Sequence, residues 1–298
     1  MTLIRRLSCW KTLLALLAML SLMGCSPRML VVSSLADELA GQSQGAESDP
    51  VLARDAAPFY LKLSEAVLAQ QPGHAALAES VAGRMTEYAY AFVAFEADRI
   101  EGQDAQAAES LRRRAAGLYR RARQHAMNAL SQRHPGLLAA LADPAAQPSL
   151  PASDAGLAYW GAAAWGSWIA LAKDDPEVVA DLPLVVRLAA VAQRADPEWG
   201  DGAMTSLRAT LEAARPGGDR IMASRWFDSA ITRAQGKLVA PYVAKAESIA
   251  LPAGQREEFE FLLKQALTVP AGSGPNTLQN TVMRQRAAWL LNQAPDLF

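Results

Sequence analysis

The sequence predicts an all-helical protein, and three observations support this fold class. Ala, Leu and Arg are the commonest of the 298 residues, whereas the Val/Ile/Thr alternation typical of strands is nearly absent. Proline and glycine fall between segments in which apolar residues recur with the period of a helix. Hydrophobic residues make up 51% of the chain and charged residues 20%, so the chain can bury a globular core. The net charge of −1 does not favour nucleic acid as a partner.

The first 24 residues have the pattern of a targeting segment. Three basic residues precede a Leu-rich apolar segment, residues 12–23. This segment runs into Leu-Met-Gly-Cys, which resembles the lipobox of bacterial lipoproteins. We therefore expect residues 1–24 to be a lipoprotein signal peptide and Cys25 to become the acylated N-terminus. A plain secretory signal or a membrane anchor is the alternative interpretation.

Lipidation at Cys25 bears on redox chemistry and on location. Cys9 leaves with the signal peptide, so the mature chain keeps no thiol for a disulfide, a metal or catalysis. Ser26 follows the cysteine, as in lipoproteins sorted to the outer membrane, so we expect an outer-membrane lipoprotein that faces the periplasm. Loss of the three basic residues leaves 26 against 30 acidic residues, a net charge of −4. Export also excludes nucleic acid as a partner.

Residues 25–50 are expected to form the lipidated N-terminus and a tether, and residues 51–298 a single helical domain. The apolar patch 29–32 is a candidate helix that packs on the body. Asp49 and Pro50 predict the start of the first helix of the domain, because Asp caps helices and Pro favours the first turn. The expected helices span residues 51–70, 74–99, 104–133, 137–141, 155–173, 177–195, 203–214, 220–235, 241–250, 255–268 and 276–293.

Two proline-containing features interrupt this pattern. Pro183 is expected to bend the helix 177–195, because proline removes a backbone donor and clashes with the preceding turn. Residues 143–154 form a long proline-rich crossing between helices. Loops of this length in a compact domain are usually functional, so we interpret this one as a binding loop or a lid.

The helices are expected to pair into hairpins. Residues 118–130 and 223–231 both resemble the second helix of a tetratricopeptide repeat (TPR), although no regular period of 34 residues runs through the chain. We predict a TPR-like array of helical hairpins, an α-solenoid, in a single domain. In such an array each hairpin buries one face against its neighbour, and a concave surface remains for a partner or a ligand.

The central helix, residues 155–173, is apolar all round and is therefore expected to be buried. Three tryptophans fall on one side of it, within an arc of roughly 140°, and small residues lie opposite. An aromatic face of this kind is either hairpin core or the wall of a cavity for an apolar or amphipathic molecule. The candidate cavity residues are Tyr159, Trp160, Trp165, Trp168, Trp199 and Met204.

The residues predict neither an enzyme nor a metal or cofactor site. None of His74, His125 and His134 has a second ligand one helical turn away, and no nucleophile-elbow, Walker A or dinucleotide motif is present. The acid pairs 174–175 and 257–258 stand at helix starts, where they complement the helix dipole. The arginine run 112–123 is either a solvated helix face or a docking patch for an acidic partner.

Several motifs resemble one family. They are Leu-Tyr-Arg-Arg-Ala-Arg at 118–123, Tyr-Trp-Gly-Ala-Ala-Ala-Trp-Gly at 159–166 with Lys-Asp-Asp-Pro at 173–176, Ala-Asp-Leu-Pro at 180–183, Asp-Pro-Glu-Trp-Gly-Asp-Gly-Ala at 196–203, Arg-Pro-Gly at 215–217, and Arg-Ala-Ala-Trp-Leu-Leu at 286–291 with the terminal Asp-Leu-Phe. From about residue 58 onward the chain is similar to the T component associated with tripartite ATP-independent periplasmic (TRAP) transporters, the TatT-type lipoproteins.

The resemblance implies a lipid-tethered periplasmic protein that assembles as a homotrimer. Each protomer would contain a largely apolar pore or cavity for a hydrophobic or amphipathic small molecule, with Trp160, Trp165 and Trp168 as lining residues. The protein would dock the periplasmic solute-binding protein, the P component, as a non-catalytic accessory of the transport system. The alternative is a TPR-type scaffold lipoprotein for protein–protein assembly in the cell envelope, with no small ligand.

Overall fold

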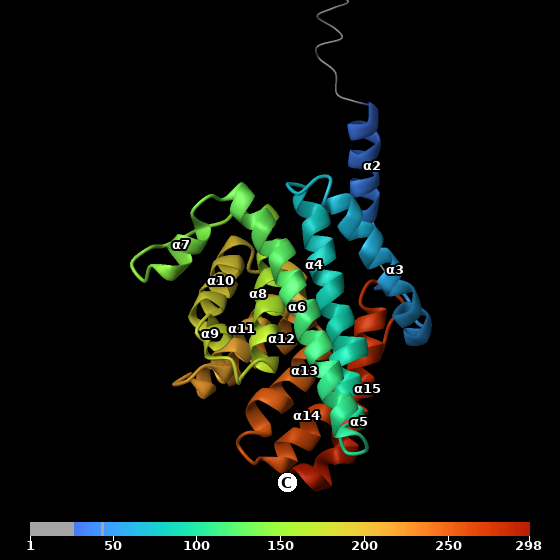
Figure 1. The fold of residues 1–298 in the computed structure, drawn as a ribbon. Coiled ribbons are helices and arrows are strands. Elements are labelled where there is room, and N and C mark those ends of the chain that lie inside the picture. The colour runs from blue at the N-terminus through green and yellow to red at the C-terminus, as the bar shows by residue number, and fades with distance from the viewer. Residues whose placement is uncertain (1–26, 43–44) are drawn as a thin grey trace, which may run out of the picture.

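The computed structural model describes residues 27–42 and 45–298, and all regular structure in these residues is helical (Figure 1). The expected signal peptide and Cys25 lie outside the described residues. None of the described helices is both long enough and apolar enough to cross a membrane.

The α-helices are α2 (Pro27–Gly41), α3 (Pro50–Leu68), α4 (Ala75–Ala89), α5 (Phe95–Ile100), α6 (Ala105–Arg133), α7 (Leu137–Ala142), α8 (Ala155–Leu171), α9 (Pro176–Val179), α10 (Leu182–Ala195), α11 (Ala203–Ala214), α12 (Arg220–Ala234), α13 (Ala240–Lys245), α14 (Arg256–Thr268) and α15 (Thr277–Leu297).

The helix starts follow the capping residues in the sequence. The Asp49 carboxylate accepts hydrogen bonds from the backbone N–H groups of Val51 and Leu52 at 2.8 and 3.2 Å, and Pro50 occupies the first turn of α3. Asp175 caps α9 in the same way. These side chains satisfy N–H groups that have no partner within the helix, so the predicted starts of both helices are confirmed to within a residue.

The expectation that Pro183 bends a single helix over residues 177–195 is wrong. Two helices occupy this segment, because α9 ends at Val179 and α10 begins at Leu182. Pro183 lies in the first turn of α10, where its missing N–H would have had no intrahelical partner. The central helix also ends at Leu171, two residues earlier than expected, whereas α15 continues to Leu297.

Two short π-helical turns were not foreseen. They are η1 (Tyr90–Ala94), between α4 and α5, and η4 (Ala246–Ala250), which follows α13. A π-turn inserts one extra residue into a helix and rotates the side chains that follow it, and such turns often occur at functional sites. Two single-turn 3₁₀ helices, η2 (Ala152–Asp154) and η3 (Trp199–Gly202), precede α8 and α11.

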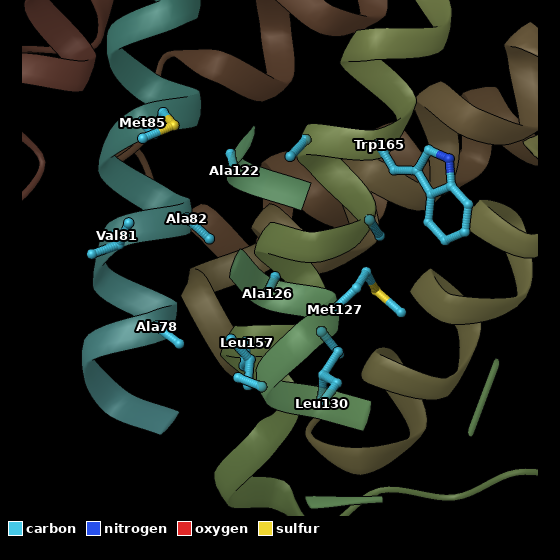
Figure 2. Packing of buried hydrophobic residues seen from close by; sticks show 14 of the residues in the cluster. Ala78, Val81, Ala82, Met85, Ala122, Ala126, Met127, Leu130, Leu157 and Trp165 are labelled. Atoms are coloured by element: carbon cyan, nitrogen blue, oxygen red, sulfur yellow. The ribbon is translucent and has the colours of Figure 1, made fainter. Parts of the chain in front are cut away.

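The longer helices pack in series along the chain: α4 on α6, α6 on α8, α8 on α10, α10 on α11, α11 on α12, α12 on α13, α13 on α14 and α14 on α15, and α4 also contacts α8. Alanines make the close contacts between α4, α6 and α8 possible, as Figure 2 shows for Ala82, Ala122 and Ala126, all of which are fully buried. This layer belongs to the main hydrophobic core, which runs from α2 to α11. A second core joins α13, η4, α14 and α15.

Helix α2 belongs to the folded body. Its Ala36 and Leu39 are 0% and 3% exposed and pack within the main core. The chain after α2 is also tied down, since the backbone N–H of Leu278 donates to the carbonyl oxygen of Gly45 at 2.9 Å. The expected candidate helix near residues 29–32 is therefore present, and it extends well beyond that patch.

Candidate functional site

Three of the candidate aromatic residues form one cluster. Tyr159 and Trp160 lie on α8, and Trp199 lies at the start of η3. The ring centroids of Tyr159 and Trp199 are 4.5 Å apart, those of Tyr159 and Trp160 4.9 Å, and those of Trp160 and Trp199 6.3 Å. All three residues are partly exposed. We call these three residues the aromatic cluster.

Helix α4 supports the cluster through a glycine. A Cβ atom placed on Gly83 would lie 2.8 Å from Cε2 of Trp160, closer than non-bonded carbon atoms approach. The indole ring therefore rests directly on the backbone of α4. Gly83 is at the middle of a helix, where glycine is unfavourable, so its value at this position is the space it leaves for the ring.

Replacing Gly83 by Ala is expected to destabilise the fold and to move Trp160. Helix propensity favours Ala by about 1 kcal/mol, but overpacking against a rigid ring costs about 1–3 kcal/mol, so we expect a net loss on the order of 1 kcal/mol. Gly117→Ala is the matched control, because Gly117 lies inside α6 with open space around it, and should stabilise by about 0.5–1 kcal/mol. Urea unfolding followed by tryptophan fluorescence measures both. Equal effects of the two substitutions would show that Trp160 does not depend on Gly83.

Polar residues of α4 lie beside the aromatic cluster, and no pattern in the sequence indicates them. Glu79 accepts a hydrogen bond from the backbone N–H of Leu157 in the first turn of α8. Desolvation, together with the nearby carboxylate of Asp154, raises the pKa of Glu79. Arg84 has a buried Nη1 atom without a hydrogen-bond partner among the described residues, and desolvation lowers its pKa. Both groups are thus held in surroundings that replace much of their hydration.

Glu87, one turn further along α4, combines two properties that rarely occur together. Its side chain is exposed, yet desolvation by the surrounding protein raises its pKa to about 7, while the charge of Arg84 opposes the shift. The pKa of Tyr159 is raised mainly because its phenol is desolvated, and the nearby charge of Glu87 raises it further. The sequence shows Glu87 only as one more acid on a helix.

Glu87 is expected to make stability depend on pH. The pKa of a glutamate is ordinarily 4.5, and that of Glu87 in the folded chain is about 7. Between these two pH values the folded chain keeps a proton on Glu87 that the unfolded chain has lost. The free energy of unfolding therefore falls as pH rises through this window, and the contribution is constant outside it. Glu87→Gln should reduce that decline in urea unfolding series and leave the part that comes from the raised pKa of Glu79, whereas Glu257→Gln, at an exposed carboxylate of α14, should leave the decline unchanged. An unchanged decline in the Glu87 variant would contradict the assignment.

Trp165 and Trp168 lie apart from the aromatic cluster, against an arginine of α6. The guanidinium carbon of Arg123 is 3.9 Å from the centroid of the Trp165 ring and 5.6 Å from that of Trp168. Trp165 is 1% exposed, and its Nε1–H donates to Asp181 at 3.2 Å. Met204 is fully buried in the main core. Of the six candidate residues, three thus form a partly exposed cluster, Trp165 and Met204 lie in the packed interior, and Trp168 is partly exposed beside Arg123.

Two pockets lie elsewhere on the described part of the molecule. One, of about 330 Å³, lies between α10 and the proline-rich crossing. Arg187 of α10 ties the end of α7 and the start of this crossing together by donating to the carbonyl oxygens of Ala140, Asp143 and Ala146 at 3.1, 2.6 and 2.8 Å. The interpretation of the crossing as a binding loop or lid stays a prediction.

The second pocket, of about 320 Å³, lies beside Arg286 of α15. Arg286 donates to Asp98 at 3.0 Å and to Glu247 at 2.6 Å, and its guanidinium carbon is 5.5 Å from the centroid of the Tyr90 ring. Tyr90 comes from one π-turn and Glu247 from the other, so both turns direct side chains onto one guanidinium group. None of the six candidate residues lines either pocket.

Comparisons with known proteins agree with the resemblance seen in the sequence. A family model described as TRAP transporter T-component matches residues 46–298, which include the aromatic cluster, both π-turns and both pockets. An uncharacterized protein of Treponema pallidum (strain Nichols) is 25% identical over 301 residues, which cover 92% of this chain and 93% of that relative. Among the described residues no group of His, Cys, Asp and Glu is arranged to hold a metal ion. The chain belongs to the TRAP transporter T-component family.

Proposed function

We propose that this protein is a non-catalytic, lipid-anchored periplasmic accessory component of a TRAP transport system. In this proposal it binds a hydrophobic or amphipathic small molecule and docks the periplasmic solute-binding protein. The observation that carries the ligand-binding part is the aromatic cluster of Tyr159, Trp160 and Trp199, whose rings are partly exposed beside polar residues of α4.

The energetics of the cluster favour an apolar occupant. Aromatic surface exposed to water is unfavourable, and its burial yields about 25 cal/mol for each Å². A ligand that covers the three rings gains this free energy without a large rearrangement of the protein. Arg84, which follows Gly83 on α4, offers a guanidinium donor for a polar end of an amphipathic molecule, and Glu87, one turn further along, offers a carboxyl donor when it is protonated.

The helix packing supports the array that we propose around this site. The longer helices pack in series, α4 on α6, α6 on α8, α8 on α10, α10 on α11 and α11 on α12, which is the packing expected of a TPR-like solenoid of helical hairpins. The inner helices of such an array line a concave surface, on which α4 and α8 would hold the ligand. We propose acylation of Cys25 at the outer membrane and a homotrimer on the strength of the lipobox and of the family.

Native mass spectrometry of the full chain, purified from membranes in mild detergent, tests the proposal. We expect trimers that carry a small apolar or amphipathic molecule, which organic extraction of the denatured protein recovers. Trp160→Ala should reduce ligand occupancy at least several-fold, whereas Trp289→Ala, at a partly exposed indole beside Arg286, should not. A ligand-free protein would contradict small-molecule binding and support the alternative, a TPR-type scaffold in which the cluster serves only as packing.

A further inference from the structure

The first turns of α2 present apolar side chains that nothing in the described residues covers. Val31 is 68% exposed and Leu35 is 41% exposed. Val31, Leu35 and Leu39 are spaced four residues apart, so they follow one face of the helix, and along this face only Leu39, which is buried with Ala36, is covered by the body. Figure 1 shows that the N-terminal part of α2 extends beyond the ends of its neighbours α3 and α4. An apolar helix end thus projects from the domain.

The distribution of charge along α2 is uneven. Arg28 is the only charged residue among the first ten residues of the helix, and the acidic pair Asp37 and Glu38 follows in its second half. The end that projects is therefore apolar with one basic residue, and the acidic residues lie near the body. This order suits a helix whose start lies at an anionic lipid surface.

The position of Cys25 places the helix start at the membrane. Only Ser26 separates Cys25 from Pro27, the first residue of α2, and two peptide units span at most about 7 Å. Val31 lies about 6 Å further along the helix axis. The headgroup layer is roughly 5–8 Å thick on each side of a bilayer. Acyl chains on Cys25 would therefore bring the first two turns of α2 to the level of the lipid headgroups.

We propose that the projecting end of α2 lies in the lipid surface and acts with the acylated cysteine as a second membrane contact. This inference rests on the proposed acylation of Cys25. The contact would also orient the domain, because α2 is fixed to the body. Besides the buried Ala36 and Leu39, its Asp37 lies 3.1 Å from Nε2 of His74, the N-cap residue of α4. A helix tied at one end to lipid and along its length to α4 sets the angle between the domain and the membrane.

Fluorescence of single labels on the full-length, processed protein tests the proposal. Cys9 leaves with the signal peptide, and an acylated Cys25 has no free thiol. A cysteine introduced by Val31→Cys or by Glu38→Cys is then the single site that reacts with the environment-sensitive NBD label. The labelled proteins are reconstituted in phosphatidylglycerol–phosphatidylethanolamine vesicles. We expect the label at position 31 to brighten several-fold and to be quenched by nitroxide-bearing lipids, whereas the label at 38, on the same helix, should be quenched by aqueous iodide.

Each other outcome has a distinct meaning. Iodide quenching of the label at 31, equal to that at 38, would overturn the lipid contact. Protection of the label at 31 from both quenchers would overturn it as well, because a second copy of the chain would then cover this face. Labelling of the unmutated chain would reveal a free thiol at Cys25, so the proposed acylation itself would be wrong, and the mass of the N-terminal peptide confirms which case applies.

Discussion

Replacing Arg286 by Ala should destabilise the protein by about 3–5 kcal/mol, the loss typical of removing one partner from a buried ion pair. Its side chain is 12% exposed and bridges two carboxylates, Asp98 near the end of α5 and Glu247 in η4. Without the guanidinium, both carboxylates remain partly buried, and the rings of Tyr90, Phe95 and Trp289 lose a cation within 6 Å.

The expected loss is large because Arg286 connects two parts of the fold. Tyr90 packs against both the main core and the core formed by α13 to α15, and Arg286 joins the same two regions through its ion pairs. We therefore expect the substitution to lower the cooperativity of urea unfolding as well as its midpoint. Arg286→Met keeps much of the volume of the side chain. It should lose less stability than Arg286→Ala, by the amount that packing of the arginine stem contributes.

Arg256→Ala is the matched control for this experiment. Arg256 also donates to a carboxylate, that of Glu260 at 2.8 Å, but its side chain is 50% exposed and the pair joins neighbouring turns of one helix. Such surface pairs contribute about 0–1 kcal/mol. A loss for Arg286→Ala no larger than that for Arg256→Ala would mean that the two regions of the fold are held together by hydrophobic packing alone.

Local patterns in the sequence predicted most of the helices, because caps and breakers act within a few residues. Asp49 and Asp175 mark helix starts wherever the rest of the chain lies. The ion pair between Asp98 and Arg286 joins residues 188 positions apart, so no local pattern could indicate it. The π-turns that bring Tyr90 and Glu247 to the same guanidinium were missed for a related reason, since tertiary packing stabilises a π-turn.

The sequence indicated which aromatic residues belong to the candidate region, but not how they are arranged in space. Helical spacing placed Trp160, Trp165 and Trp168 within one arc, but an arc does not say which neighbouring helix covers which part of it. In the structure α6 covers Trp165 with Arg123, and Gly83 of α4 receives Trp160. The polar residues of α4 escaped notice because the surroundings that perturb Glu79 and Glu87 form only after folding.

Trp165→Ala is expected to cost about 3–5 kcal/mol of stability, the range for truncation of a buried large aromatic residue. Trp165 is 1% exposed and is enclosed by Arg123 above its ring and by Asp181 at its Nε1 atom. The substitution leaves a cavity, and it also exposes two charged groups to an apolar space. Trp165→Phe should lose less, because it keeps an aromatic ring beside Arg123, although it loses part of the indole volume and the hydrogen bond to Asp181.

Trp168→Ala, three residues along the same helix, separates packing from ligand binding. Trp168 is partly exposed and its ring lies 5.6 Å from Arg123, so we expect its truncation to cost clearly less stability than that of Trp165. Thermal unfolding, together with ligand occupancy from native mass spectrometry, gives both quantities for each variant. If Trp165 belongs to the core, its truncation lowers stability and affects occupancy only through unfolding. Loss of ligand from a Trp165→Ala protein of unchanged stability would instead place this indole in the wall of the binding cavity. A ring whose removal leaves the free energy of unfolding unchanged is not part of the packing that holds α6 to α8.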